Sequence, residues 1–186
     1  MRVIAGEFRS RVLKTLPGLD TRPTPDRLRE SLFNVLSAEI AGAIFLDAYA
    51  GTGAVGIEAL SRGAAKAIFI ERSRAAVSVI HDNLQALRLS ARAHVVHGKA
   101  LAHLAQYRPD IVFLDPPYDQ PREYTAALEL LGGTAPSLVI AQHSRRFALA
   151  ATYGRLARTR ELRQGDNILT FYRPADRAMP FQSLSL

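Results

Sequence analysis

Four consecutive residues, Asp115-Pro116-Pro117-Tyr118, could hold and orient an exocyclic amine. They follow an apolar run over residues 110–115 that predicts a buried strand. The Asp115 carboxylate and the Pro116 carbonyl are acceptors, and a proline adds no competing N–H. Two acceptors placed against the N–H bonds of an amine would turn its lone pair toward a methyl donor, while Tyr118 stacks on the base. Orientation of the amine and electrostatic attraction would then account for the rate of methyl transfer. An acidic proline turn that merely leaves the sheet is the alternative.

A second pattern is the glycine spacing G-x-G-x-x-G at Gly51, Gly53 and Gly56. An apolar strand at residues 44–46 precedes it and an apolar helical pattern follows. Glycines let the backbone turn sharply and approach a ligand. Glu71 stands 20 residues beyond Gly51, the offset at which an acid reaches ribose hydroxyls in nucleotide-binding α/β units. A glycine turn that only packs helix on strand is the alternative.

The position of Asp47 indicates which nucleotide would bind. This carboxylate ends the strand four residues before the first glycine, where it would repel a diphosphate and attract an ammonium group. S-adenosylmethionine carries an ammonium, a sulfonium and a ribose but no phosphate. The pattern therefore favours S-adenosylmethionine over NAD.

Composition limits the remaining functions. The chain of 186 residues is 48% apolar and 22% charged, which predicts one globular domain. The sequence is irregular from Pro174 onward, so we expect the domain over residues 1–173 and an irregular tail over 174–186. Without cysteine there is no disulfide framework and no thiol nucleophile, and the five scattered histidines predict no metal site. We expect no transmembrane helix and no signal peptide, and therefore a cytoplasmic protein.

The charge is asymmetric along the chain. The net charge is +7, and arginines gather in residues 1–30 and 145–177 while the centre carries most of the acids. Arginine pairs with phosphate through a bidentate fork, so two basic flanks suit a polyanionic partner. Charge alone does not distinguish RNA, DNA and membrane.

Strands alternate with helices along most of the chain. This order predicts an α/β fold with a mostly parallel sheet, helices on both faces, and ligands beyond the carboxyl ends of the strands. We expect Asp47, Glu71, Lys99 and Asp115 to meet there in one crevice. The other expected elements are an N-terminal β-hairpin over 1–16, helices over 24–40, 74–87, 100–105 and 123–131, strands over 66–70, 93–96 and 137–141, and an antiparallel pair over 153–162 and 167–173.

These motifs carry a resemblance to a known family. The Asp115–Tyr118 motif and the glycine turn resemble the Rossmann-like class I S-adenosylmethionine methyltransferases that act on exocyclic amines. Residues 22–34 (RPTPDRLRESLFN), 58–64 (EALSRGA) and 2–6 (RVIAG) narrow the resemblance to the RsmD family, which methylates guanine N2 in small-subunit ribosomal RNA. The resemblance covers about residues 1–173.

The resemblance implies roles for individual residues. The target amine would be held by Asp115, Pro116, Pro117 and Tyr118; S-adenosyl-L-methionine would be bound by Asp47, Ala48, Gly51, Gly53, Glu71, Arg72, Lys99 and Ala100; and the substrate would be bound by Arg9, Arg11, Arg22 and Thr24. The partner would be ribosomal RNA or the assembled small subunit, with no membrane involved. A monomer is the default expectation.

Two positions depart from the family, and other functions stay open. Lys99 stands where an acid usually accepts from the adenine amine, so adenine would rest on backbone near Ala100 with weaker affinity. Gln142 stands where Glu is expected. The alternatives are an adenine-N6 methyltransferase on DNA or RNA, a protein-amide methyltransferase, and a non-catalytic RNA-binding protein that retains the fold.

Overall fold

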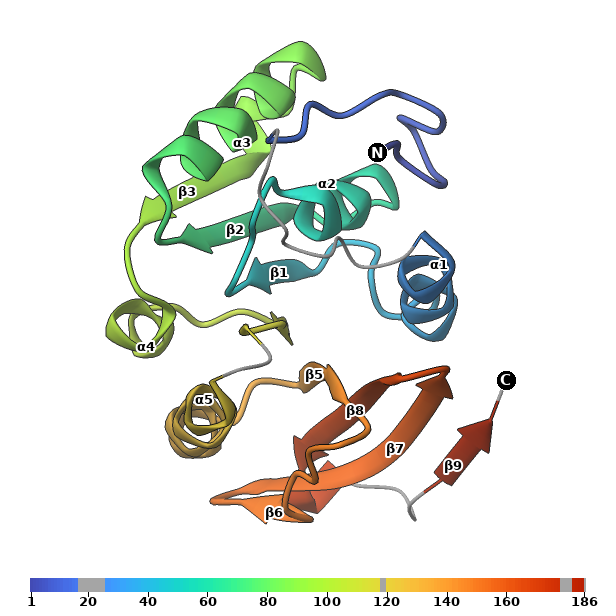
Figure 1. Ribbon diagram of the computed structural model, residues 1–186, viewed down its shortest axis with the longest axis vertical. Helices are drawn as coiled ribbons and strands as arrows, with labels where there is room; N and C mark the ends of the chain where they lie inside the picture. The colour runs from blue at the N-terminus through green and yellow to red at the C-terminus, as the bar shows by residue number, and fades with distance from the viewer. Residues whose placement is uncertain (17–25, 118–119, 178–181, 186) are drawn as a thin grey trace. The chain divides into compact units, whose positions relative to one another are not determined.

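The computed structural model of the protein describes residues 1–16, 26–117 and 120–177, and the backbone of 182–185 (Figure 1). The chain divides into two compact units, Met1–Lys99 and Ala100–Leu186.

The first unit is built on three parallel strands. Its elements are α1 (Asp26–Val35), β1 (Ile44–Asp47), α2 (Ala54–Ser61), β2 (Lys66–Glu71), α3 (Arg74–Ala86), a 3-10 turn (Ser90–Arg92) and β3 (Ala93–His97). The strand β2 lies between β1 and β3, with Asp47 beside Phe69 and Glu71 beside His97. The carboxyl ends of all three strands therefore lie at one edge, as predicted for a ligand site.

Helices α2 and α3 supply the apolar residues that cover this sheet. One buried cluster joins Ile57 of α2 and Ile80 of α3 with Phe69 of β2. Gly56 allows α2 to approach the strand closely, because a Cβ there would lie 2.2 Å from the Phe69 ring. The third glycine of the motif is thus a packing residue, and the helix start stands over the carboxyl end of β1.

The N-terminal segment, residues 1–16, differs from its prediction. The expected hairpin is only one antiparallel bridge, Arg2 with Val12, around a turn that includes Ser10 at φ 68°. The segment instead uses its side chains for packing: Val3 and Leu13 enter the apolar cluster of α2 and α3. The apolar residues of this segment therefore pack on helices α2 and α3, a contact that the hairpin prediction missed.

The helix α1 is also shorter than predicted. It ends at Val35, and turns continue to Glu39, after which the Ile40 N–H still bonds to the Leu36 carbonyl at 3.0 Å. The predicted start at Thr24 lies outside the described residues. The apolar spacing of Leu28, Leu32 and Leu36 is confirmed, since all three are buried.

The second unit begins with the last parallel strands and ends with antiparallel ones. Its elements are α4 (Ala100–His103), a 3-10 turn (Leu104–Gln106), β4 (Ile111–Leu114), α5 (Pro121–Thr134), β5 (Leu138–Ser144), β6 (Thr152–Tyr153), β7 (Leu156–Gln164), β8 (Asn167–Pro174), a 3-10 turn (Ala175–Arg177) and β9 (Gln182–Ser185). β4 and β5 are parallel, and β5, β8, β7 and β6 pair in that order antiparallel. The predicted antiparallel pair is confirmed.

The tail corrects another prediction. Residues 174–186 were expected to be irregular, but β9 pairs parallel with β7, along Arg160 to Arg163 (Figure 1). A long strand such as β7 leaves unpaired N–H and C=O groups along its open side, and a short strand can satisfy them. The strand β9 thus belongs to the sheet of the second unit.

Candidate active site

The glycine turn between β1 and α2 uses its backbone donors internally. Gly51 and Gly53 have φ of 53° and 84°, the left-handed conformation that glycine adopts readily. The Gly51 N–H donates to Glu71 Oε2 at 2.8 Å, the Gly53 N–H to the Ala50 carbonyl at 2.7 Å, and the Gly56 N–H to Asp47 Oδ2 at 3.1 Å. A diphosphate-binding turn aims such donors at its ligand. These bonds therefore favour a cofactor without phosphate.

Glu71 holds this turn and still has acceptor capacity. Its Oε2 accepts from Gly51 and its Oε1 accepts from the Ser73 N–H at 2.7 Å. The side chain is half-buried, and an ionised carboxylate offers about four acceptor positions. Contact of Glu71 with ribose hydroxyls stays a prediction, and its bond to Gly51 is a role that the spacing did not reveal.

Asp47 is buried beneath the turn, with 1% of its surface exposed. Burial raises the pKa of its carboxyl group to about 7, the Gly56 N–H acts in the opposite direction, and the charge of Glu71 adds to the rise. Asp47 thereby anchors the first turn of α2 and carries a full charge only above neutral pH. Its predicted attraction for an ammonium group stays a prediction.

This raised pKa predicts a pH dependence of stability. Between pH 4 and pH 7 the folded chain would keep a proton on Asp47 that the unfolded chain has lost. The free energy of unfolding should then fall as pH rises through this range, by up to roughly 1.4 kcal/mol per pH unit from this group, and level off above pH 7. Asp47→Asn keeps an acceptor for Gly56 and should remove this contribution. Urea unfolding at several pH values measures it.

The exposed Asp176 offers a matched control for Asp47. Asp176→Asn should keep the wild-type dependence on pH. Equal slopes for wild type and Asp47→Asn would show that the Asp47 carboxyl group titrates alike in the folded and unfolded chain.

The other predicted cofactor residues differ in exposure. Ala48 is buried, while Arg72 and Lys99 are exposed. The Gly98 N–H bonds to the Glu71 carbonyl at 3.0 Å, which brings the loop that carries Lys99 beside the end of β2. Ala100 is buried at the first position of α4. Weaker adenine binding because of Lys99 stays a prediction, as does the joining of Asp115 with the first unit's acids in one crevice.

The Asp115 motif follows β4 directly. Asp115 is half-buried, Pro116 is buried and Pro117 is exposed, while Tyr118 lies outside the described residues. The Pro116 carbonyl, predicted as an acceptor for the amine, already accepts from the Tyr124 hydroxyl at 3.1 Å. A carbonyl has two lone pairs, so capacity for a second donor remains. Sequence reasoning missed Tyr124, whose only signal was its position on the buried face of the helix that follows the motif.

The predicted substrate residues lie near the N-terminus. Arg9 and Arg11 are exposed, and Arg22 and Thr24 lie outside the described residues. Three polar helix residues fix the backbone that carries these arginines. Glu58 accepts from the N–H groups of residues 4 and 5 at 2.8 and 3.0 Å, Ser61 Oγ accepts from residue 8 at 3.0 Å, and Asn83 Oδ1 accepts from residue 14 at 2.8 Å.

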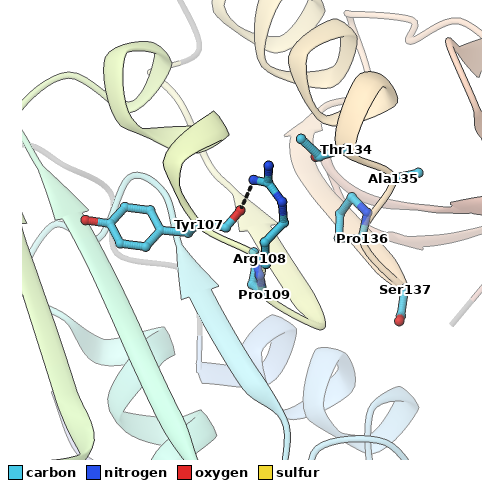
Figure 2. Close-up of a pocket in the computed structure, with 7 residues that line it drawn as sticks. All are labelled: Tyr107, Arg108, Pro109, Thr134, Ala135, Pro136 and Ser137. Atoms are coloured by element: carbon cyan, nitrogen blue, oxygen red, sulfur yellow. Dashed lines mark hydrogen bonds between the residues drawn. The ribbon is translucent and has the colours of Figure 1, made fainter.

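Figure 2 shows a hollow of the second unit. It measures about 200 Å³ and is lined by residues 107–109 and 134–137. These residues precede β4 and β5, whereas Asp115 follows β4, so the hollow lies at the opposite end of the strands. Ligand pockets are usually larger, roughly 300–1,000 Å³. We therefore do not assign it to the amine or the cofactor.

Two further predictions concern absences. Within residues 1–16, 26–117 and 120–177, no group of three or more His, Cys, Asp or Glu could hold a metal ion. No described helix is long and apolar enough to cross a membrane.

Comparison with known proteins gives consistent matches. A family model described as "Conserved hypothetical protein 95" matches residues 1–173. YlbH of Bacillus subtilis, a candidate rRNA methyltransferase, is 36% identical and aligns over 93% of this chain and 98% of its own length. Ribosomal RNA small subunit methyltransferase D of Escherichia coli is 45% identical over 63% of this chain and 60% of its own length. The solved structure of yhhF from Escherichia coli, a candidate methyltransferase, is 36% identical, with a TM-score of 0.82 over 94% of this chain and 97% of that one.

Proposed function

Because the chain belongs to the RsmD family, the family of the matching model, we propose that it methylates the exocyclic N2 amine of a guanine in small-subunit ribosomal RNA. S-adenosyl-L-methionine is its cofactor. The observation that carries this function is the Asp115-Pro116 acceptor pair directly after β4. Residues 1–173 would act as one methyltransferase domain.

The first unit supplies the cofactor side of the proposal. When bound, S-adenosylmethionine supplies a methyl group on a sulfonium. Glu71 would accept from the ribose hydroxyls, and Asp47 would attract the positive charge from beneath the turn, chiefly above pH 7. Gly51 and Gly53 would let the backbone approach the cofactor, with Ala48, Arg72, Lys99 and Ala100 around it. The internally bonded glycine turn supports this cofactor over a dinucleotide.

The Asp115 motif supplies the amine side. The Asp115 carboxylate and the second lone pair of the Pro116 carbonyl would each accept one N–H of the guanine amine. The nitrogen lone pair would then face the methyl group, while Tyr118 stacks on the base and Pro117 closes the turn. Each group acts by position and electrostatics, and no covalent bond to the protein forms.

The proposal places the enzyme in the cytoplasm as a monomer that acts on ribosomal RNA or the assembled small subunit. An adenine-N6 methyltransferase is the rival, because the same acceptors suit that amine. Transfer of labelled methyl to free small-subunit RNA, assembled subunits and DNA, followed by nucleoside analysis, tests both. We expect N2-methylguanosine. Label in N6-methyladenosine would support the rival, and RNA binding without methyl transfer would indicate a non-catalytic RNA-binding protein that retains the fold.

Salt dependence tests the proposed RNA contact of the N-terminal segment. Arg9 and Arg11 are exposed, and each phosphate contact of an arginine releases counterions. Plots of log affinity against log salt have a negative slope. The double variant Arg9→Gln/Arg11→Gln should make this slope shallower by roughly one to two units. RNA binding measured by fluorescence anisotropy at several salt concentrations gives this slope.

Arg88, also exposed but outside both basic flanks, is the matched control. Arg88→Gln should leave the slope unchanged. A wild-type slope in the double variant would place the RNA on another surface.

A further inference from the structure

A buried tyrosine hydroxyl touches the backbone of the proposed amine site. Tyr124 in α5 is 1% exposed, and its hydroxyl lies 3.1 Å from the Pro116 carbonyl oxygen and 2.9 Å from the Gln142 carbonyl oxygen. One side chain therefore connects three segments of the second unit: the loop after β4, helix α5 and strand β5. All of these contacts lie within that unit.

The apolar surroundings of Tyr124 do not require a hydroxyl. Its ring lies 5.4 Å from that of Phe147 and 6.3 Å from that of His143, centroid to centroid. Phenylalanine would fill the same space without the cost of burying a hydroxyl, which must be offset by hydrogen bonds. The hydroxyl has one proton, which lies between the two carbonyl oxygens, and this shared hydrogen bond is the stabilising contribution that distinguishes tyrosine from phenylalanine here.

The Pro116 carbonyl has one degree of freedom that its own ring does not fix. Proline restricts φ, but the direction of its carbonyl depends on ψ. A following proline confines ψ to the extended region without fixing it to one value. The hydroxyl proton of the rigidly packed Tyr124, shared with the Gln142 carbonyl, restrains this remaining rotation and occupies one of the two lone pairs of the Pro116 oxygen.

We propose that Tyr124 is a positioning residue for methyl transfer, an inference that rests on the proposed function. Its hydroxyl orients the Pro116 carbonyl so that the second lone pair points at the target amine. Tyr124 does not touch the base in this proposal; it acts through Pro116. Tyr124 lies behind the residues that would contact the amine, and it is not part of the Asp115–Tyr118 motif.

The variant Tyr124→Phe removes the hydroxyl and keeps the ring. The single-turnover rate at saturating RNA and S-adenosylmethionine should fall roughly fivefold to tenfold, the rate equivalent of one hydrogen bond. The dissociation constant of S-adenosylmethionine should stay within twofold of wild type. Saturating cofactor also stabilises a weakened variant by mass action, and circular dichroism checks that it is folded.

The second unit offers a matched control. Tyr172 is also fully buried, and its hydroxyl donates to the Ala150 carbonyl at 2.8 Å, a backbone group outside the Asp115 motif. Tyr172→Phe makes the same chemical change and should lower thermal stability to a similar extent, yet leave the single-turnover rate unchanged. Incorporation of 3-fluorotyrosine at position 124, which retains the hydroxyl, should keep at least half of the wild-type rate.

The outcomes separate this inference from the proposed function. If Tyr124→Phe and Tyr172→Phe lose stability alike while both keep the wild-type rate, the Tyr124 hydroxyl is structural and the inference is overturned. A loss of rate with 3-fluorotyrosine equal to that of Tyr124→Phe would also overturn it. An inactive wild-type protein on ribosomal RNA would instead refute the proposed function.

Discussion

Replacing Asp115 with alanine should slow methyl transfer at least roughly a hundredfold, the usual effect of removing one aimed polar group from an active site. The target amine would lose one of its two acceptors, so its lone pair would no longer be held toward the methyl group. Asp115→Asn keeps a carbonyl oxygen at the same position and should lose less, roughly tenfold. Both variants should bind S-adenosylmethionine with near wild-type affinity.

Asp115 lies at a position where its side chain can be replaced without disturbing the apolar core of β4. Residues 111–114 of β4 are all buried and pair with β5, so the backbone that leads to Asp115 is fixed. Asp115 itself is half-buried, and its replacement leaves the apolar core of the strand intact. A loss of rate can therefore be assigned to the carboxylate and not to unfolding.

Asp110 provides the control, because it is exposed at the other end of the same strand. Asp110→Ala should retain the wild-type rate. Single-turnover transfer of labelled methyl, with cofactor affinity from titration calorimetry, measures both. Near-normal turnover by Asp115→Ala would remove this residue from the reaction.

The sequence predicted the parts of the fold that depend on local patterns. The strands β1, β2, β3, β4 and β5 were found to within three residues at each end, because their apolar runs are bounded by charged or turn residues. The helix α3 was likewise found, with Ile80 and Leu84 on its buried face. The glycine turn and the acid at Glu71 were predicted from their spacing in the sequence. The short connection between β1 and α2 fixes the position of the turn.

The missed features depend on contacts between residues far apart in the chain. Glu58 bonds to residue 4 across 54 positions, and Asn83 bonds to residue 14 across 69. Tyr124 reaches Gln142 across 18 positions. No periodicity marks such pairs, because the side chains are polar residues on otherwise apolar helix faces. The tail was missed for a similar reason, since pairing of β9 with β7 is decided by the partner strand.

Glu58→Ala should be strongly destabilising, lowering the free energy of unfolding by about 3–5 kcal/mol, the range for removing one partner of a buried ion pair. Glu58 is fully buried, and its carboxylate accepts from the N–H groups of Ile4 and Ala5 and from Arg62 Nε at 2.8 Å. Burial lowers the pKa of the Arg29 guanidinium, and the charge of Glu58 acts in the opposite direction. The variant would leave these donors and charges without their common acceptor.

Loss of Glu58 should also weaken RNA binding, because the segment that bears Arg9 and Arg11 would lose two of its anchoring bonds.

Glu58→Gln keeps one acceptor oxygen and should be less destabilised, whereas Glu30→Ala, at an exposed position of α1, should stay within about 0.5 kcal/mol of wild type. At roughly 2–4 °C per kcal/mol for a chain of this size, Glu58→Ala should melt about 6–20 °C lower by calorimetry. A melting temperature equal to that of Glu30→Ala would mean that the docked N-terminal segment contributes little to stability. Unchanged RNA affinity in a folded Glu58→Ala protein would mean that the arginines bind RNA without a fixed backbone.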